Sequence, residues 1–182
     1  MNRLSGAVLS ALILVLLLFL SVKAEYKHEF TGASKCRVCH MGKKKGDQYG
    51  VWKETKHANA YLTLASPEAK AVAEKAGQGG KPPQETPACL KCHLTAWDAP
   101  AELLGTKYSK EEGVSCESCH GPGKDYSTIK IMKDQALAVE NGLIIPKKED
   151  CLKCHNKESP TYKPFDFDTF WAKIVHDNPL TE

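Results

Sequence analysis

The stretch Cys116-Glu117-Ser118-Cys119-His120 decides the fold of this chain, because its pattern, Cys-x-x-Cys-His, occurs four times. We number the copies in chain order as motifs one to four, and together they use all 8 cysteines. The candidate residues are Cys36, Cys39 and His40 in motif one, Cys89, Cys92 and His93 in motif two, Cys116, Cys119 and His120 in motif three, and Cys151, Cys154 and His155 in motif four.

The pattern Cys-x-x-Cys-His is the attachment site of c-type haem. The two thiols bind the porphyrin as thioethers, and the adjacent histidine is placed to bind the iron. Zinc sites and redox dithiols also use Cys-x-x-Cys, and 8 cysteines in a secreted chain can form disulfides. Neither alternative requires a histidine directly after the second cysteine, yet one follows in every copy. We therefore predict four covalently bound c-type haems.

The N-terminus indicates export. Arg3 precedes an uncharged, leucine-rich run from Ala7 to Val22, and Val22 and Ala24 suit the positions before a signal-peptidase site. We predict a signal peptide over residues 1–24 that is cleaved, and a periplasmic domain over 25–182. The alternative is an uncleaved anchor, which would be the chain's only contact with the inner membrane. An extracellular location is also open.

Chain length limits the size of the core. The mature chain provides about 40 residues for each predicted haem, too few to bury a large apolar core of its own. The porphyrins must then act as the core. We predict one domain with a mainly α fold, in which short helices and loops wrap around four closely packed haems.

The formal charge changes when the haems are counted. The chain has 25 Lys and Arg against 22 Asp and Glu. The mature polypeptide is near +1, and haem propionates, offset by the ferric iron, bring the oxidised protein to about −3. Lys43-Lys44-Lys45 near motif one is either a solvated loop or a patch that steers an acidic partner. We predict redox proteins as electron donor and acceptor, and no nucleic acid.

Local patterns predict helices over 47–64, from Ser66 to a stop at Gly77, over 125–141, and from Asp166 onward. The stretch from Gly77 to Pro87 is predicted to be a loop that leads to motif two. The last helix carries an apolar stripe that is predicted to pack on porphyrin or on the preceding segment. Its residues are Phe167, Phe170, Trp171, Ile174 and Val175.

Three histidines lie outside the motifs: His28, His57 and His176. Each is a candidate for the second axial position of an iron. His57 is predicted to lie on a helix soon after motif one, His176 to close the last helix, and His28 to lie near the mature N-terminus. Met132 is a further candidate. Three histidines cannot complete four irons, so one haem is predicted to be five-coordinate and open to a small ligand.

At four places the sequence resembles the tetrahaem cytochrome c-554 family of periplasmic multihaem proteins. The matching stretches are Gly32-Ala33-Ser34-Lys35-Cys36, Trp52 to Ala58, Gly113 to Gly123, and Phe165-Asp166-Phe167-Asp168. The resemblance implies a mainly helical fold, haems in closely stacked pairs, and electron transfer between a periplasmic donor and acceptor. It also implies three bis-histidine haems and one five-coordinate haem, the latter attached at Cys89 and Cys92.

Three functions follow as hypotheses. The first is an electron carrier that passes electrons along its haems, and it is the one we favour. The second is a reductase of nitric oxide or another nitrogen oxide at the five-coordinate haem. The third is a subunit of a filament with haems stacked end to end. The carrier hypothesis implies that the chain is not an enzyme, or has only a minor reductase activity.

Overall fold

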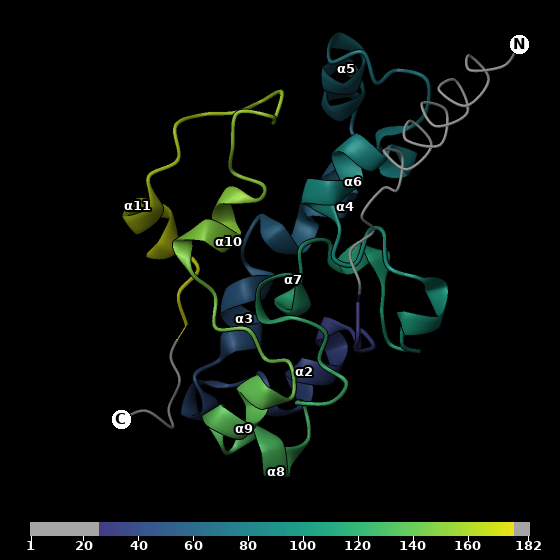
Figure 1. The fold of residues 1–182 in the computed structure, drawn as a ribbon. Helices are drawn as coiled ribbons and strands as arrows, with labels where there is room; N and C mark the ends of the chain where they lie inside the picture. The colour runs from purple at the N-terminus through teal and green to yellow at the C-terminus, as the bar shows by residue number, and fades with distance from the viewer. Residues whose placement is uncertain (1–25, 177–182) are drawn as a thin grey trace, which may run out of the picture.

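The computed structural model describes residues 26–176 (Figure 1). The predicted signal segment lies outside this range. The helices are α2 Ala33–His40, α3 Gln48–Lys53, α4 Ala60–Thr63, α5 Pro67–Lys75, α6 Pro87–His93, α7 Cys116–His120, α8 Ile129–Met132, α9 Gln135–Glu140, α10 Lys148–Leu152 and α11 Phe167–Trp171. Short 3-10 turns are η1 Lys43–Lys45, η2 His57–Asn59, η3 Pro83–Glu85, η4 Ala101–Leu103 and η5 Lys110–Glu112.

The predicted mainly α fold is confirmed. Within residues 26–176 the only β pairing is an isolated parallel bridge between Phe30 and Leu104. In Figure 1, α7 lies near the centre of the molecule, with α2 close to it and α10 and α11 together at one side. No helix in the described part of the chain is both long and apolar enough to span a bilayer.

The helix predicted from Ser66 is confirmed as α5. The Ser66 hydroxyl accepts a hydrogen bond from the Ala69 N–H at 3.1 Å, and Pro67 occupies the first helical position, where its missing N–H costs nothing. Gly77 follows the helix with a φ of 72°. Most L-residues disfavour this left-handed conformation, so the glycine ends the helix.

The helix predicted over 47–64 is broken in the middle. α3 ends at Lys53, and the chain resumes in η2 and α4. At the break the Trp52 carbonyl accepts hydrogen bonds from both the Thr55 N–H (2.9 Å) and the Thr55 hydroxyl (2.7 Å). A threonine that bonds backward in this way competes with the regular helical pattern. The predicted continuous helix is therefore wrong, and His57 begins a 3-10 turn instead.

The stretch predicted as helical over 125–141 contains two short helices, α8 and α9. Asp134 separates them, because its carboxylate accepts the Leu137 N–H at 3.0 Å and so starts a new helix. α9 ends as predicted at Asn141, and Gly142 follows with a φ of 99°.

The last helix starts as predicted, with the Asp166 carboxylate accepting the Thr169 N–H at 2.9 Å. It ends at Trp171, so the prediction that His176 closes this helix is wrong. The aromatic part of its stripe packs within the C-terminal segment: Phe167 stacks on Trp171, and Phe170 stacks on Phe165.

The polypeptide core is small, as chain length predicted. No large side chain in the described residues is fully buried. The buried apolar side chains include four alanines, and the full set is Phe30, Ala33, Ala58, Leu64, Ala73, Leu94, Tyr126 and Ala138. Large apolar side chains next to the motifs, such as Val38, Leu152 and Ile144, are exposed. This surface is available for a large apolar group to cover.

Candidate haem-binding site

Each motif lies on or beside a short helix. Motif one ends α2, motif two ends α6, and motif three forms the whole of α7. Motif four differs, because α10 ends at Leu152 and His155 lies beyond it in a turn. The His155 N–H still donates to the Cys151 carbonyl at 2.9 Å, so one further helical turn continues in part.

No disulfide joins the eight motif cysteines, and four of them form two pairs between different motifs. Cys36 and Cys116 are hydrogen-bonded, which lowers the pKa of Cys36 and raises that of Cys116. A similar bond between Cys92 and Cys154 lowers the pKa of Cys92 and raises that of Cys154. Motif one therefore adjoins motif three, and motif two adjoins motif four.

An electrostatic interaction, weaker than these hydrogen bonds, connects the two pairs. Burial raises the pKa of Cys119 to about 11, and the next largest contribution is repulsion by Cys151. Cys119 belongs to motif three and Cys151 to motif four. The cysteines therefore place the motifs in the spatial order one, three, four, two.

Three of the four motif histidines are held through Nδ1. In each case a carbonyl or amide oxygen fixes the ring, which leaves Nε2 as the nitrogen free to bind a metal. The bonds are His40 Nδ1 to Gln48 Oε1 (3.3 Å), His93 Nδ1 to the Ala60 carbonyl (2.9 Å) and His120 Nδ1 to the Ile144 carbonyl (3.1 Å).

His155 is held differently. Within the described residues no hydrogen bond reaches its ring. The ring stacks instead on Phe165, with centroids 4.6 Å apart and planes 16° apart. Phe170 stacks in turn on Phe165, at 5.2 Å and 19°.

Two of the three spare histidines face a motif histidine. The ring centroids of His57 and His155 are 6.0 Å apart with planes at 68°, and those of His176 and His120 are 6.0 Å apart at 60°. A bond from a metal to an imidazole nitrogen is about 2.0 Å, so imidazoles on opposite sides of one iron have centroids about 6 Å apart. Both pairs fit the two axial positions of a haem iron.

Burial also favours this use of the rings. It lowers the pKa of His57 and of His120 below the usual range for histidine. In both cases desolvation is the largest cause, because burial disfavours the charged imidazolium. The neutral ring that remains at neutral pH is the form that binds a metal.

His28 has a different environment. Its Nδ1 lies 2.5 Å from the Asp125 carboxylate, and the edge of its ring that carries Nε2 lies against Gly142. Within residues 26–176 its ring contacts no motif histidine, in contrast to His57 and His176. His40 and His93 likewise have no histidine ring facing them in this part of the chain.

The segment from Trp52 to Ala60 connects three motifs. The Trp52 indole N–H donates to the Val114 carbonyl at 2.9 Å, and the Val114 N–H donates to the His57 carbonyl at 3.0 Å. Gly113 allows this approach, because its φ is 59° and a Cβ there would lie 2.7 Å from the His57 carbonyl oxygen. The segment thus contacts the residues before motif three, while Ala60 holds His93 and His57 faces His155.

Glu117 holds motif three in place, a role that the sequence did not reveal. This carboxylate is only 3% exposed. It accepts the backbone N–H groups of Thr31 (2.7 Å), Gly32 (2.8 Å) and Gly123 (2.7 Å). Such charge-assisted bonds compensate the burial of the carboxylate. They tie motif three to the chain just before motif one.

Glu112 makes a related contact at the start of α2. Its carboxylate accepts the N–H groups of Ala33 at 2.8 Å and Ser34 at 3.2 Å, which are unpaired within the helix. Burial raises the pKa of Glu112, although these two bonds oppose the shift. No sequence signal indicated this role, because Glu112 is far from α2 along the chain.

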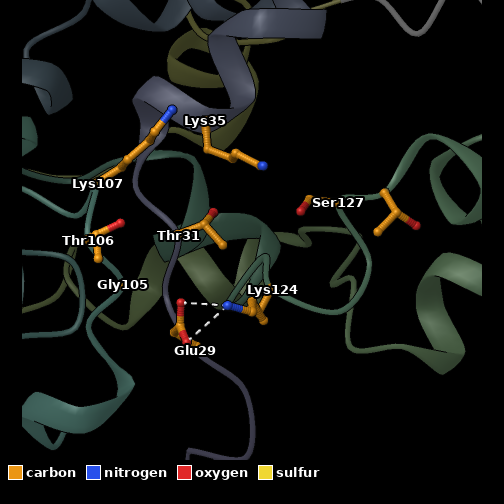
Figure 2. A pocket seen from close by; sticks show the side chains of 9 residues that line it. Glu29, Thr31, Lys35, Gly105, Thr106, Lys107, Lys124 and Ser127 are labelled. Atoms are coloured by element: carbon orange, nitrogen blue, oxygen red, sulfur yellow. Dashed lines mark hydrogen bonds and ion pairs between the residues drawn. The ribbon is translucent and has the colours of Figure 1, made fainter.

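A hollow of about 370 Å³ lies beside the start of α2 (Figure 2). Its lining includes the lysines Lys35, Lys107 and Lys124, and Lys124 pairs with Glu29 at 3.0 Å. In Figure 2 the side chains of Lys35 and Lys107 extend on the side away from this ion pair. None of the candidate cysteines and histidines lines the hollow. It is a positively charged surface feature next to motif one, separate from the haem positions.

Comparison with known proteins finds matches in sequence. The family described as cytochrome c554 and c-prime matches residues 35–121, which include motifs one to three. Cytochrome c-554 of Nitrosomonas europaea is 29% identical over 156 residues, which cover 74% of this chain and 61% of that protein. The chain therefore spans less than two thirds of the length of this relative.

The fold has a solved counterpart. The structure of the reduced state of cytochrome c554 from Nitrosomonas europaea matches with a TM-score of 0.50 and 27% sequence identity. The match covers 80% of this chain and 78% of that one. The resemblance predicted from the motifs is thereby confirmed: in sequence and in fold, the chain is similar to cytochromes of the c-554 family.

Proposed function

We propose that this protein is a periplasmic electron carrier that holds four c-type haems. The observation that carries the proposal is the spatial order of the cysteines, one, three, four, two, in which each motif lies near the next. Haems attached to neighbouring cysteines would lie near one another. Electrons would then have a route through all four haems from motif one to motif two.

The chain's own residues have distinct roles in this proposal. The eight cysteines attach the porphyrins, and His40, His93, His120 and His155 bind the irons from one side. His57 and His176 provide the opposite ligands for motifs four and three, and His28 stays the candidate for a third haem. Each haem, when bound, supplies a one-electron redox couple whose potential is set by its axial ligands and surroundings.

The arrangement suits outer-sphere transfer. An iron with two histidine ligands has no open position, so it exchanges electrons without binding a substrate. The hydrogen bonds from Nδ1 of His40, His93 and His120 fix the ring orientation and strengthen these ligands. Fixed ligands change little between oxidation states.

A redox partner is proposed to dock near motif one. Lys35 and Lys107 give this side a positive charge, although the oxidised holoprotein is negative as a whole. An acidic patch on a donor or acceptor would be attracted there, and the attraction would raise the association rate at low ionic strength.

Stopped-flow mixing tests the carrier function. Reduced holoprotein is mixed with an excess of an oxidised small c-type cytochrome that has an acidic surface patch. We expect about four electrons to leave each chain, with the haem absorbance changing in step with the acceptor. Failure to reduce the acceptor, at any ionic strength, would contradict the proposal.

Charge reversal tests the docking side. Changing Lys35 and Lys107 to glutamate is expected to slow the second-order reaction at low salt and weaken its salt dependence. Changing Lys130 and Lys133 to glutamate is the matched control with the same change in net charge, since both are exposed at α8 and outside the hollow. Equal slowing by both variants would show that only net charge matters.

A second function is favoured by the surroundings of His93. Within the described residues no histidine ring faces it, although the Ala60 carbonyl holds its Nδ1. His40 shares this feature, and the family resemblance favours motif two. We propose that the motif two haem is five-coordinate and binds nitric oxide or carbon monoxide when reduced. Steady-state consumption of nitric oxide well above that of a His93→Met variant would indicate a reductase. Binding without turnover would leave the protein a carrier.

A further inference from the structure

We infer that Phe165 is a positioning residue for His155: its ring fixes the rotation of the His155 imidazole about the bond to iron. The inference rests on the proposed function in one respect, namely that His155 binds the haem of motif four. It adds a role for a residue outside the motifs and outside the set of histidines.

The need for such a residue comes from what His155 lacks. His40, His93 and His120 are each fixed by a hydrogen bond at Nδ1. Such a partner normally sets the orientation of a metal-bound imidazole. No hydrogen bond reaches the His155 ring within the described residues. An imidazole held only through Nε2 would be free to turn about that bond.

Phe165 supplies the missing restraint. The two rings are nearly parallel, 16° apart, with centroids at 4.6 Å, which is within the range of aromatic stacking. A rotation of the His155 ring would break this contact or push Phe165 aside.

Phe165 is itself held in place by a neighbouring ring. Phe170 stacks on it at 5.2 Å and 19°, and the Phe170 centroid also lies 6.4 Å from that of His155, so Phe170 lies beside both rings. The Lys173 ammonium lies 5.0 Å from the Phe170 ring centroid. Asp166, the next residue, caps α11 and so fixes the backbone at this point. The restraint on His155 therefore comes from Phe165 together with a ring of the last helix.

The restrained angle matters because His57 faces His155 from the other side. The planes of these two imidazoles are 68° apart. The angle between two axial imidazole planes determines how the iron d orbitals split, and this splitting sets the g values of the oxidised low-spin haem. With Phe165 in place, we expect the angle between the two imidazole planes to be the same in every molecule. Without it, the angle is expected to spread or relax toward a smaller value.

Electron paramagnetic resonance of the oxidised holoprotein provides the test. In Phe165→Leu, the low-spin signal of one haem per chain is expected to shift in g value and broaden, while the remaining signals stay unchanged. Phe165→Tyr keeps a stacking ring and is expected to keep the wild-type signal. The midpoint potential of the same single haem is expected to shift in Phe165→Leu alone.

Phe167→Leu is the matched control. Phe167 lies in the same segment and also stacks on an aromatic ring, Trp171, at 5.5 Å, but it contacts no histidine. It is expected to leave all low-spin signals unchanged. A Phe165→Leu spectrum identical to those of wild type and Phe167→Leu would overturn the inference.

Two further variants keep the test decisive. If Phe165→Leu does not retain all its haems by intact mass, Phe170→Leu keeps Phe165 but removes the ring that lies beside both Phe165 and His155, and a broadened signal from the same haem is expected. An unchanged Phe170→Leu signal would then overturn the inference. His155→Ala identifies the signal: if it alters no low-spin haem, the proposed ligand set fails, whereas a silent Phe165→Leu beside an altered His155→Ala rejects only the positioning role.

Discussion

Motif three and motif four are fixed by different forces. Motif three is held by a buried carboxylate, Glu117, which accepts hydrogen bonds from the backbone N–H groups of Thr31 and Gly32, far away in the chain, and of nearby Gly123. Motif four lies at the side of the molecule, where aromatic rings of the C-terminal segment stack on a partly exposed histidine. The first arrangement joins the chain together and supports global stability. The second acts locally and, in the role we propose for it, orients one metal ligand.

The largest expected effect comes from His57, which connects the two regions. Its carbonyl accepts from Val114 before motif three, and its ring faces His155 of motif four. His57→Ala is expected to convert one low-spin haem completely to high-spin and to raise its potential, because the lost donor stabilised the ferric state. Visible spectra and a redox titration measure both.

Lys56→Ala is the control for this variant, since Lys56 is exposed and directly precedes His57. It should leave the spin state of every haem as in wild type. Identical spectra for His57→Ala and wild type would remove His57 from the ligand set.

The next effect is on the motif three side. Glu117→Ala leaves three backbone N–H groups without their partner, and we expect a loss of about 3 kcal/mol or more in the free energy of unfolding. Denaturation by guanidinium chloride, followed by far-UV circular dichroism, measures it. The comparison variant Glu158→Ala removes an exposed ion pair with Lys91 and should not move the midpoint measurably. Similar midpoints for the two variants would show that the buried carboxylate does not stabilise the fold.

A smaller loss in the free energy of unfolding is expected for a change at the contact between the two regions. Gly113→Ala places a Cβ against the His57 carbonyl in a left-handed backbone conformation, at a cost of about 1–3 kcal/mol. Gly80→Ala, where a Cβ would meet no atom within 4 Å, should be neutral or slightly stabilising. Equal stability of the two variants would contradict the close approach of these segments.

The smallest effect is a pH dependence from Glu112. Burial raises its pKa in the folded state, so the folded chain retains this proton to higher pH than the unfolded chain. The contribution of Glu112 to the free energy of unfolding therefore falls as the pH rises from the pKa of Glu112 in the unfolded chain through its pKa in the folded chain. Glu112→Gln should lack that slope, and its stability relative to wild type should improve from acid to neutral pH. Unfolding midpoints across this range check the sign, and parallel curves would reject it.

The sequence predicted much of what repeats or acts locally. The four motifs, the Ser66 and Asp166 caps, and the stops at Gly77 and Asn141-Gly142 are all short-range patterns. The helix breaks at Thr55 and Asp134 were missed because the side chains that cause them also occur inside helices. His176 was predicted to close the last helix, but the helix ends at Trp171. The His176 ring nevertheless faces His120.

The long-range contacts had no such signal. Glu117 lies between the two cysteines of motif three, and two of its three donors, Thr31 and Gly32, come from a segment that only the fold brings close. The same holds for Phe165, which was assigned to a family-like stretch without a partner. Spacing along the chain predicts which groups bind haem. It does not predict which groups hold those ligands in position.

The most direct test of the account is a coulometric reductive titration of the purified holoprotein, with protein concentration determined independently. Four haems in contact predict about four electrons accepted per chain, with a haem-type absorbance change throughout. A chain that accepts fewer than four electrons, or that shows no haem absorbance, would contradict the central claim that all four motifs form one electron-transfer path.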